Sequence, residues 1–419
     1  MSYIFLFLFI IATFIRPQDW VQGMIAWPLV NVLAVLTLIG LIFERMGTNK
    51  NFFFKVPQNK LILWFFFSIL MSHIVHTYLW GLRISFFDFL PVLILFYLTL
   101  NGIDTIKKFK ISFWLIVILN LILVKQGVDQ FNNFYGWAGQ SVTIDSGPEG
   151  VVHRINWIGI LGDPNDLALS FVVAFGFLLP FMLSKGSIVI KLFSWCGASA
   201  LLYGVYLTNS RGGIVAVLST LFFFFVRKTR KFMLGGIIGG VLGSVFLIFA
   251  PSRMEGLSSS SGSASSRLDL WYEGLQIFKR NLIFGRGYGM FMEDLPQTAH
   301  NSYVLAASEL GTVGLILWVA LLYSSIKFCW IIQEKDKILE PYAIALQSSI
   351  FGFAVAAFFL SRTYNMIPFI LVALSGSLMH IYAQKDQDIK YNLAKKDWIA
   401  VSCIAIFSIF AVYCFVRTR

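Results

Sequence analysis

Residues 298–326 read "TAHNSYVLAASELGTVGLILWVALLYSSI", and this stretch indicates the class of fold. After His300 and Asn301 it continues as an apolar run over 302–326. A helix rises about 1.5 Å per residue, so roughly 20 apolar residues span the ~30 Å hydrocarbon layer of a bilayer. The run is therefore long enough to cross a membrane as a single helix.

Runs of this kind recur along the whole chain. Of the 419 residues, 58% are hydrophobic and 13% are charged, and the mean hydropathy is +0.76. A water-soluble globular protein could not cover its surface with so few polar residues. We therefore predict an all-α polytopic membrane protein of about 12–13 transmembrane helices, with residues 1–419 forming a single integral membrane domain. The thirteen apolar runs lie near residues 2–15, 24–43, 61–79, 84–100, 111–124, 167–184, 188–208, 212–226, 232–250, 302–326, 341–360, 366–383 and 398–416.

The basic residues predict how these helices are oriented. If the loop between the second and third runs faces the cytoplasm, the loops on that side carry seventeen lysines and three arginines. The opposite side then carries eleven arginines and two lysines. By the positive-inside rule the amino terminus is inside, and the loops 125–166 and 251–301 are outside. We expect short helices in both loops, which together would form the outer active-site region.

Arginine dominates the outer side, and its planar guanidinium grips a phosphate through two hydrogen bonds. The outer face is therefore predicted to bind an anion. One outer arginine, Arg211, stands in "TNSRGG" (208–213), in a turn whose glycines would let the backbone approach a ligand closely. The alternative is a tight turn between helices, with an arginine that extends to the membrane interface.

A second outer arginine, Arg267, lies in "SSSSGSASSRLDLWYEGLQIFKR" (258–280). Apolar residues recur at helical spacing after the serine-rich tract. Ser266 and Asp269 form an S-x-x-D start signal, which puts Arg267 in the first turn of a helix, where free amide hydrogens favour an anion. The alternative is an interfacial helix that rests on the bilayer, and the two interpretations are compatible.

Two further motifs have simple structural explanations. In "DPND" (163–166), Asp163 is expected to cap the sixth span, with Pro164 at its first position, rather than to bind a metal. The stretch "GRGYG" (285–289) lacks the strand and βαβ unit of a dinucleotide-binding fingerprint. We interpret it as a turn that presents Arg286.

A lone histidine is usually structural, but His300 and Asn301 stand at the foot of a helix below the arginine-rich loop. His300-Asn301, nine residues, Gly311, two residues and Gly314 resemble the H-[NSQ]-x9-G-x-x-G pattern of the bacterial O-antigen ligases. "RINWIGILGDPNDLAL" and "TNSRGG" resemble outer-loop segments of the O-antigen ligase and polymerase superfamily, in the same order. The two glycines are expected to let this helix pack closely against a neighbour.

This resemblance implies a membrane glycosyltransferase that uses no nucleotide sugar, no cofactor and no metal. Its donor would be a glycan on undecaprenyl diphosphate, presented at the periplasmic face of the bacterial inner membrane. Its acceptor would be a sugar of the lipid A core, and nucleic acid is not an expected partner. The resemblance assigns the diphosphate to Arg211 and Arg267, and an essential role in catalysis to His300. The weaker candidates for the site are Arg154, Arg286, Arg362 and Asn301.

The chemistry of these residue types agrees with that assignment. Breaking a glycosyl–phosphate bond leaves a diphosphate whose growing negative charge is stabilised by fixed arginines. A histidine with a pKa near neutrality can take the proton from an attacking sugar hydroxyl.

Other functions remain open from the sequence. An O-antigen polymerase, which uses lipid-linked glycan as both donor and acceptor, is the main alternative, and the histidine-asparagine motif favours the ligase. A transporter of lipid-linked oligosaccharides would need ionisable residues near mid-membrane and a repeat between its halves, and we find neither clearly. A scaffold role leaves the arginine bias unexplained. The predicted thirteenth span departs from the twelve of such ligases, which leaves the acceptor open.

Overall fold

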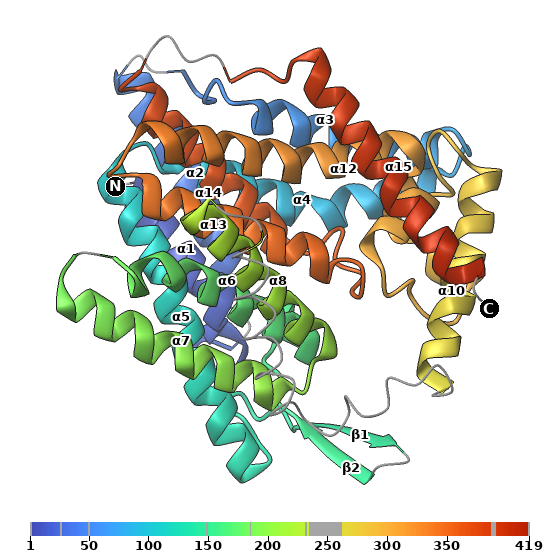
Figure 1. The fold of residues 1–419 in the computed structure, drawn as a ribbon, viewed down its shortest axis with the longest axis horizontal. Helices are drawn as coiled ribbons and strands as arrows, with labels where there is room; N and C mark the ends of the chain where they lie inside the picture. Colours follow the sequence, from blue (N-terminus) through green and yellow to red (C-terminus); the bar gives the residue numbers. More distant parts are fainter. Residues whose placement is uncertain are drawn as a thin grey trace.

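The protein is a bundle of long helices (Figure 1). The computed structural model describes residues 2–25, 27–48, 51–147, 150–184, 186–230, 233, 262–386 and 391–417. The predicted ninth span, 232–250, lies outside these residues except for residue 233, as do Arg253 and Arg419 among the outer arginines.

Each of the other twelve predicted spans corresponds to one helix, which confirms the all-α membrane fold. Within the described part of the chain, nine helices are long and apolar enough to cross a membrane. The twelve helices are α1 (Ser2–Ile15), α2 (Leu29–Thr48), α3 (Pro57–Ile74), α4 (Leu79–Gly102), α5 (Ile106–Asn133), α6 (Pro164–Met182), α7 (Ile188–Thr208), α8 (Arg211–Thr229), α12 (Ser302–Lys335), α13 (Glu340–Ala356), α14 (Met366–Ala383) and α15 (Lys395–Arg417).

Three helices differ clearly from their predicted bounds, and one of them, α12, runs to Lys335, nine residues past its predicted end. The second helix begins at Leu29, directly after Pro28, and not near residue 24. A proline is well suited to the position before a helix but cannot donate a backbone hydrogen bond inside it. The fifth helix runs to Asn133, nine residues past the predicted end of its apolar run, because its last turns are polar and hydropathy does not detect them.

Helices α6, α8 and α13 pack closely together, and α6 is the most buried of the candidate membrane spans. Nearly every side chain of α6 is buried, whereas α2 and α15 lie at the periphery and expose apolar faces. Glycines allow the central helices to approach closely: a Cβ atom at Gly352 of α13 would lie 1.9 Å from Thr220 Oγ1 of α8. A Cβ atom at Gly176 of α6 would lie 2.3 Å from Ser349 Oγ of α13. Close packing therefore fixes these three helices relative to one another.

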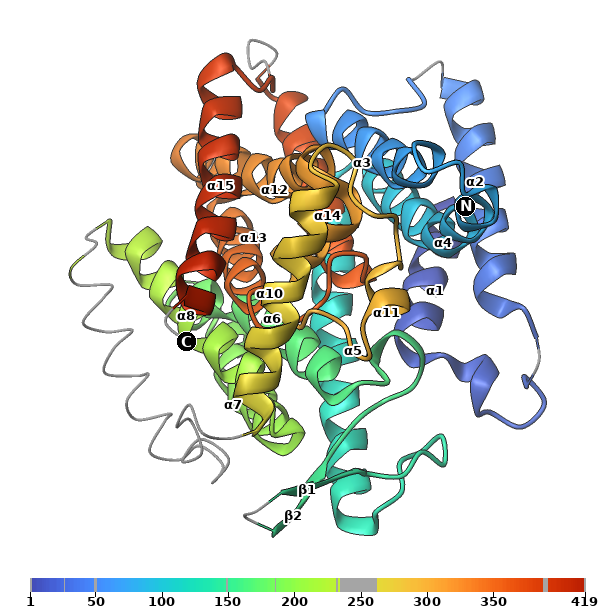
Figure 2. The same ribbon diagram turned by 90° about the vertical axis from the view of Figure 1, so that its right-hand side faces the viewer.

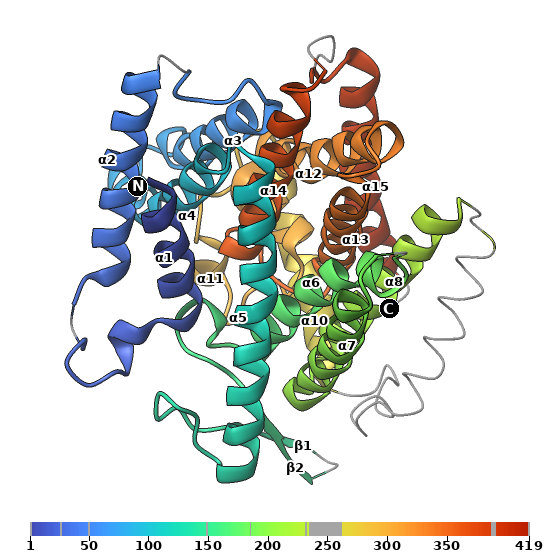
Figure 3. The same ribbon diagram turned by 90° about the vertical axis from the view of Figure 1, so that its left-hand side faces the viewer.

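The two predicted outer loops both contain regular structure. The first loop holds an antiparallel hairpin, β1 (Thr143–Gly147) and β2 (Gly150–Arg154), and a short 3-10 turn, η2 (Gly159–Leu161). The second loop holds α10 (Gly262–Arg280) and the short α11 (Phe291–Asp294). In Figure 1 the hairpin and α10 lie towards the right-hand side, and Figure 2 shows α10 and α11 facing the viewer from that side. The amino terminus faces the viewer in Figure 3, from the opposite side. The hairpin was not predicted.

The start predicted for α10 was wrong. The helix begins at Gly262, so Arg267 is its sixth residue and not part of the first turn. Small residues precede Arg267 and continue the helix upstream, and Ser266 therefore lies inside it. Amide hydrogens at the helix start do not explain anion binding at Arg267.

Helix α12 is interrupted at Gly311, which has a φ of 67°. The loop that follows α10 lies against this interruption. The amide of Arg286 donates to Ser308 O (2.8 Å), and the amide of Thr312 donates to Leu282 O (2.8 Å). A Cβ atom at Gly311 would lie 2.4 Å from the backbone of Ile283. The close contact expected at Gly311 is therefore made to a loop and not to a neighbouring helix.

Candidate active site

Two arginines from distant parts of the sequence lie near each other on the side predicted to be outside. Arg211 is the first residue of α8, a helix capped by Ser210, whose hydroxyl accepts from the amide of Gly213 (3.1 Å). Arg267 projects from α10, and its pKa is lowered by burial and, next, by the positive charge of Arg211. Neither guanidinium has a hydrogen bond or an ion pair within the described residues. Two half-buried positive charges therefore lie close enough to interact, and neither is paired within the part of the chain that the structure describes.

His300 is held beside these arginines by the start of α12. Its φ of 49° is left-handed, a conformation that residues with side chains adopt infrequently. The next residue, Asn301, caps α12 by accepting hydrogen bonds from the amides of Tyr303 (2.9 Å) and Val304 (3.1 Å). Trp271, one turn after Arg267, donates its indole hydrogen to Ala299 O (2.9 Å). The helix that carries Arg267 is thus tied to the residue before His300.

The imidazole of His300 is half-buried in a positive environment. Burial is the largest cause that lowers the pKa of His300, followed by the charges of Arg267 and Arg362. Asp163 acts in the opposite direction but does not reverse the shift. A lowered pKa keeps the imidazole neutral at neutral pH, so one ring nitrogen is available to accept a proton.

Arg362 lies in the same cluster, but its charge is compensated. Its guanidinium pairs with Asp163 (3.4 Å) and with Asp166. Its amide donates to the hydroxyl of Ser302 (2.8 Å), which joins the loop between α13 and α14 to the start of α12. Asp163 also accepts from the amide of Asn165 (2.7 Å), which confirms its predicted role as the cap of α6.

Asp163 and Asp166 of "DPND" therefore both pair with Arg362, and Asp163 also caps α6. Among the described residues, no group of three or more histidine, cysteine, aspartate or glutamate side chains could hold a metal ion. Sequence reasoning missed the pairing of Arg362 with Asp163 and Asp166, because about 200 positions separate the partners along the chain.

Comparison with known families identifies this region. Residues 196–319, from α7 to the first half of α12, match the family model described as O-Antigen ligase. This part of the chain is similar to an O-antigen ligase domain. The matched segment contains Arg211, Arg267, His300 and both glycines of the histidine motif. A search of the curated proteins gave no match. The match supports the general family of O-antigen ligases and polymerases for this region.

The weaker candidates in and around the O-antigen ligase domain have structural partners. Arg154, at the end of β2, donates to Thr208 O (2.9 Å) and to Asn165 Oδ1 (3.0 Å), which joins the hairpin to α6 and α7. Arg286 pairs with Asp294 (3.3 Å) in the loop after α10. Asn301 uses its amide oxygen as a helix cap, and its buried Nδ2 has no partner.

The domain also contains a buried carboxylate that sequence reasoning did not assign. Glu309, 2% exposed, accepts hydrogen bonds from the amide of Phe291 (3.2 Å) and the hydroxyl of Tyr364 (2.8 Å). It thereby joins α11 to the loop that carries Arg362. The available signal was a single carboxylate in the apolar run 302–326. Such residues are costly to bury and need defined partners.

Proposed function

We propose that the protein is a ligase that transfers a glycan from undecaprenyl diphosphate to a sugar of the lipid A core, at the periplasmic face of the bacterial inner membrane. The observation that carries this proposal is the pair Arg211 and Arg267, two half-buried arginines without a counter-charge among the described residues, near a neutral His300. They lie in the region similar to an O-antigen ligase domain, whose enzymes act on lipid-linked glycans.

A diphosphate fits the arginine pair by charge and by geometry. Two like charges in a partly dry site repel each other, and an anion with several oxygen atoms relieves that repulsion. Each guanidinium can form two parallel hydrogen bonds to phosphate oxygens. When the bond between the sugar and the diphosphate breaks, negative charge grows on the leaving group. Fixed arginines stabilise that charge most strongly in the transition state.

His300 acts as the general base in this proposal. Its neutral imidazole accepts the proton of the acceptor hydroxyl while the hydroxyl oxygen bonds to the anomeric carbon of the donor sugar. The bond from that carbon to the phosphate oxygen breaks, and undecaprenyl diphosphate leaves with the electron pair. Arg362 stays paired with Asp163 and Asp166 and supports the electrostatic environment of His300. No metal or cofactor takes part.

The test is transfer by the purified protein with two acceptors offered in parallel. One acceptor is lipid A core, and the other is a second molecule of the lipid-linked glycan. We expect glycan on lipid A core, and we expect the rate to persist when EDTA is added. Elongation of the lipid-linked glycan alone would overturn the ligase in favour of the polymerase. Loss of transfer in EDTA with recovery in magnesium would overturn the metal-independent mechanism.

A further inference from the structure

A cavity of about 540 Å³ lies at the ends of α2, α4 and α14 that point away from the candidate active site. Its lining includes Arg45, Lys55, Asp104 and His380. Helix α14 begins at Met366, four residues after Arg362. His380 lies on the same helix, fourteen residues after Met366. At about 1.5 Å per residue this places the cavity some 21 Å along the helix axis from the active site. The cavity is therefore a separate feature of the protein.

Arg45 is the unusual member of this lining. It is 5% exposed, and its Nη2 donates to Asn101 O (2.7 Å). Its Nε is buried without a partner, and no carboxylate pairs with Arg45 in the part of the chain that the structure describes. The guanidinium also lies over the ring of Phe54, 4.9 Å from its centroid. A guanidinium has five N–H donors, and a buried charge is costly when it lacks an opposite charge.

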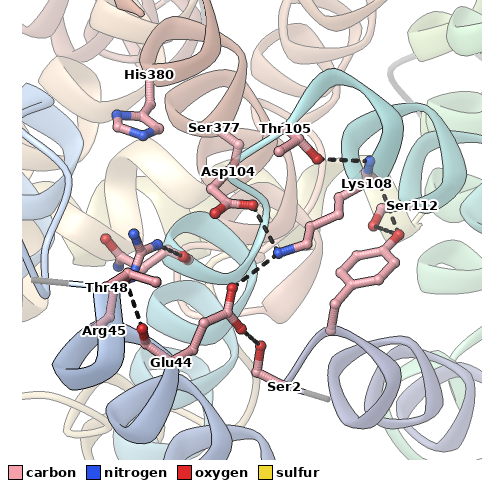
Figure 4. A network of polar contacts seen from close by, with 12 residues as sticks. Ser2, Glu44, Arg45, Thr48, Asp104, Thr105, Lys108, Ser112, Ser377 and His380 are labelled. Carbon is pink, nitrogen blue, oxygen red and sulfur yellow. Dashed lines mark hydrogen bonds and ion pairs between the residues drawn. The ribbon is translucent and has the colours of Figure 1, made fainter. Parts of the chain in front are cut away.

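The two carboxylates near Arg45, those of Glu44 and Asp104, both interact with Lys108. Lys108 lies 2.8 Å from Asp104 Oδ1 and 3.4 Å from Glu44 Oε1. Figure 4 shows the ammonium of Lys108 between these two carboxylates, while Arg45 lies on the other side of Glu44 with its own bond to a backbone oxygen. Asp104 and Glu44 thus share Lys108, and neither forms an ion pair with Arg45 in the described structure. Arg45 and Lys55 leave an excess of positive charge on the cavity wall.

A second, larger cavity of about 960 Å³ adjoins the first and shares Phe53, Phe54 and Lys55 with it. The rest of its lining is mainly apolar and includes Trp64 and Tyr97. A half-polar pocket with excess positive charge, continuous with an apolar groove at the ends of membrane helices, has the shape and polarity of a phospholipid. His380 stacks on Phe54 with 3.4 Å between ring centroids and so fixes the shared wall.

We propose that these two cavities bind an anionic phospholipid, with its phosphate against Arg45 and Lys55 and an acyl chain along Trp64 and Tyr97. The phosphate supplies the counter-charge that Arg45 lacks, and the guanidinium can bind its oxygens through more than one hydrogen bond. The apolar groove selects a lipid over free phosphate. This site is independent of glycan transfer, so its test does not depend on the proposed function.

The experiment measures lipid binding to the full-length protein in detergent by native mass spectrometry. Phosphatidylglycerol and phosphatidylcholine with the same acyl chains are compared, and glycerol phosphate serves as the soluble competitor. We expect phosphatidylglycerol to bind at least about tenfold more tightly than phosphatidylcholine. Arg45→Gln and Lys55→Gln should each weaken its binding by about fivefold, the factor typical of one basic residue near a membrane surface.

Lys107→Gln is the matched control, because Lys107 is exposed at the start of α5 and belongs to neither cavity lining. It removes the same charge from the same end of the bundle and should leave lipid binding unchanged. If Arg45→Gln does not fold, the exposed Lys55 decides the test. Equal binding of the two lipids, or an equal loss in Lys107→Gln, would overturn the site. Competition by glycerol phosphate at concentrations similar to the lipid would assign the pocket to soluble phosphate esters and overturn the lipid.

Discussion

Two sets of basic residues in the helix bundle differ in their partners. At the end away from the active site, Lys327 lies 2.6 Å from Asp397, and Lys385 lies 2.8 Å from Asp336. At the active-site end, Arg211 and Arg267 face each other without a counter-charge among the described residues. A paired lysine is explained by the fold itself. A half-buried arginine without a partner is explained by a ligand, and the comparison therefore separates structural cations from binding cations.

The largest expected effect comes from removing either unpaired arginine. Arg211→Ala and Arg267→Ala should each lower the rate of glycan transfer by about 100- to 1,000-fold, because the leaving diphosphate loses a fixed positive charge. Lysine at either position should restore activity only partly, since it cannot form two parallel hydrogen bonds. The measurement is the transfer rate of purified, correctly inserted protein.

Arg280→Ala is the control for this prediction, because Arg280 is an exposed arginine on the same helix as Arg267. It should transfer at the wild-type rate. An equal loss in Arg280→Ala would mean that the general positive charge of α10 matters and that Arg267 is not special.

The next largest effect concerns His300, whose neutrality distinguishes it from the charged residues around it. His300→Ala should slow transfer by roughly 100-fold and leave donor affinity nearly intact, as expected for the loss of a general base. In the wild type, transfer should stay near its maximum until the pH falls below about 6.5, the ordinary pKa of histidine, because burial and the nearby arginines lower the pKa of His300. The measurements are kcat from pH 5 to 8 and donor affinity.

A purely structural histidine gives a different result. His300→Ala would then have a lower melting temperature but a turnover per folded molecule within a few-fold of the wild type. The transfer rate of His300→Ala would also still fall at acidic pH, as it does in the wild type.

A smaller effect is expected from the buried carboxylate that supports the site. Glu309→Gln leaves one amide oxygen in place of two carboxylate acceptors, so the bonds from Phe291 and Tyr364 cannot both remain as they are. We expect transfer to fall about tenfold, from the loss of one hydrogen bond to a charged group. The readout is kcat per folded molecule, measured beside the melting temperature.

Ser308→Ala is the matched control, because the hydroxyl of Ser308 bonds only within its own helix in the described structure. It should keep the wild-type kcat. If Ser308→Ala and Glu309→Gln lose activity equally, the loss reflects a general disturbance of the start of α12. The carboxylate of Glu309 then has no separate role.

The smallest effect on transfer is expected at the paired lysine Lys327, away from the active site. Asp397→Asn removes the counter-charge of Lys327, which is largely buried, and should lower the free energy of unfolding by about 1–2 kcal/mol. Transfer per folded molecule should not change. Denaturation in detergent and the transfer assay test the two parts, and a large loss of transfer would break the distinction between the two sets of basic residues.

The sequence was sufficient for features that depend on local patterns. Apolar runs long enough to span a bilayer predicted twelve helices in the described residues, and the spacing in "DPND" predicted the cap at Asp163. The motifs also selected Arg211, Arg267 and His300, which the structure places in one cluster. Their roles in binding and catalysis remain proposals.

Features that depend on distant contacts could not be read from the sequence. The pairing of Arg362 with Asp166 joins segments far apart in the chain, and the partners of Glu309 come from two other segments. The hairpin at 143–154 lies in a polar loop, where short strands give little periodic signal. The sequence predicted a close contact at Gly311, but only the structure shows that this contact is made to the loop after α10.

The central claim is that Arg211 and Arg267 bind the diphosphate, and the most direct test is binding without catalysis. The measurement is the affinity of purified wild type, Arg211→Ala, Arg267→Ala and Arg280→Ala for undecaprenyl diphosphate that carries no glycan. The account predicts that affinity falls at least about tenfold in the first two variants and is unchanged in Arg280→Ala, because a lost charge-assisted contact to phosphate costs about 1.5–3 kcal/mol. Wild-type affinity in both Arg211→Ala and Arg267→Ala would contradict it.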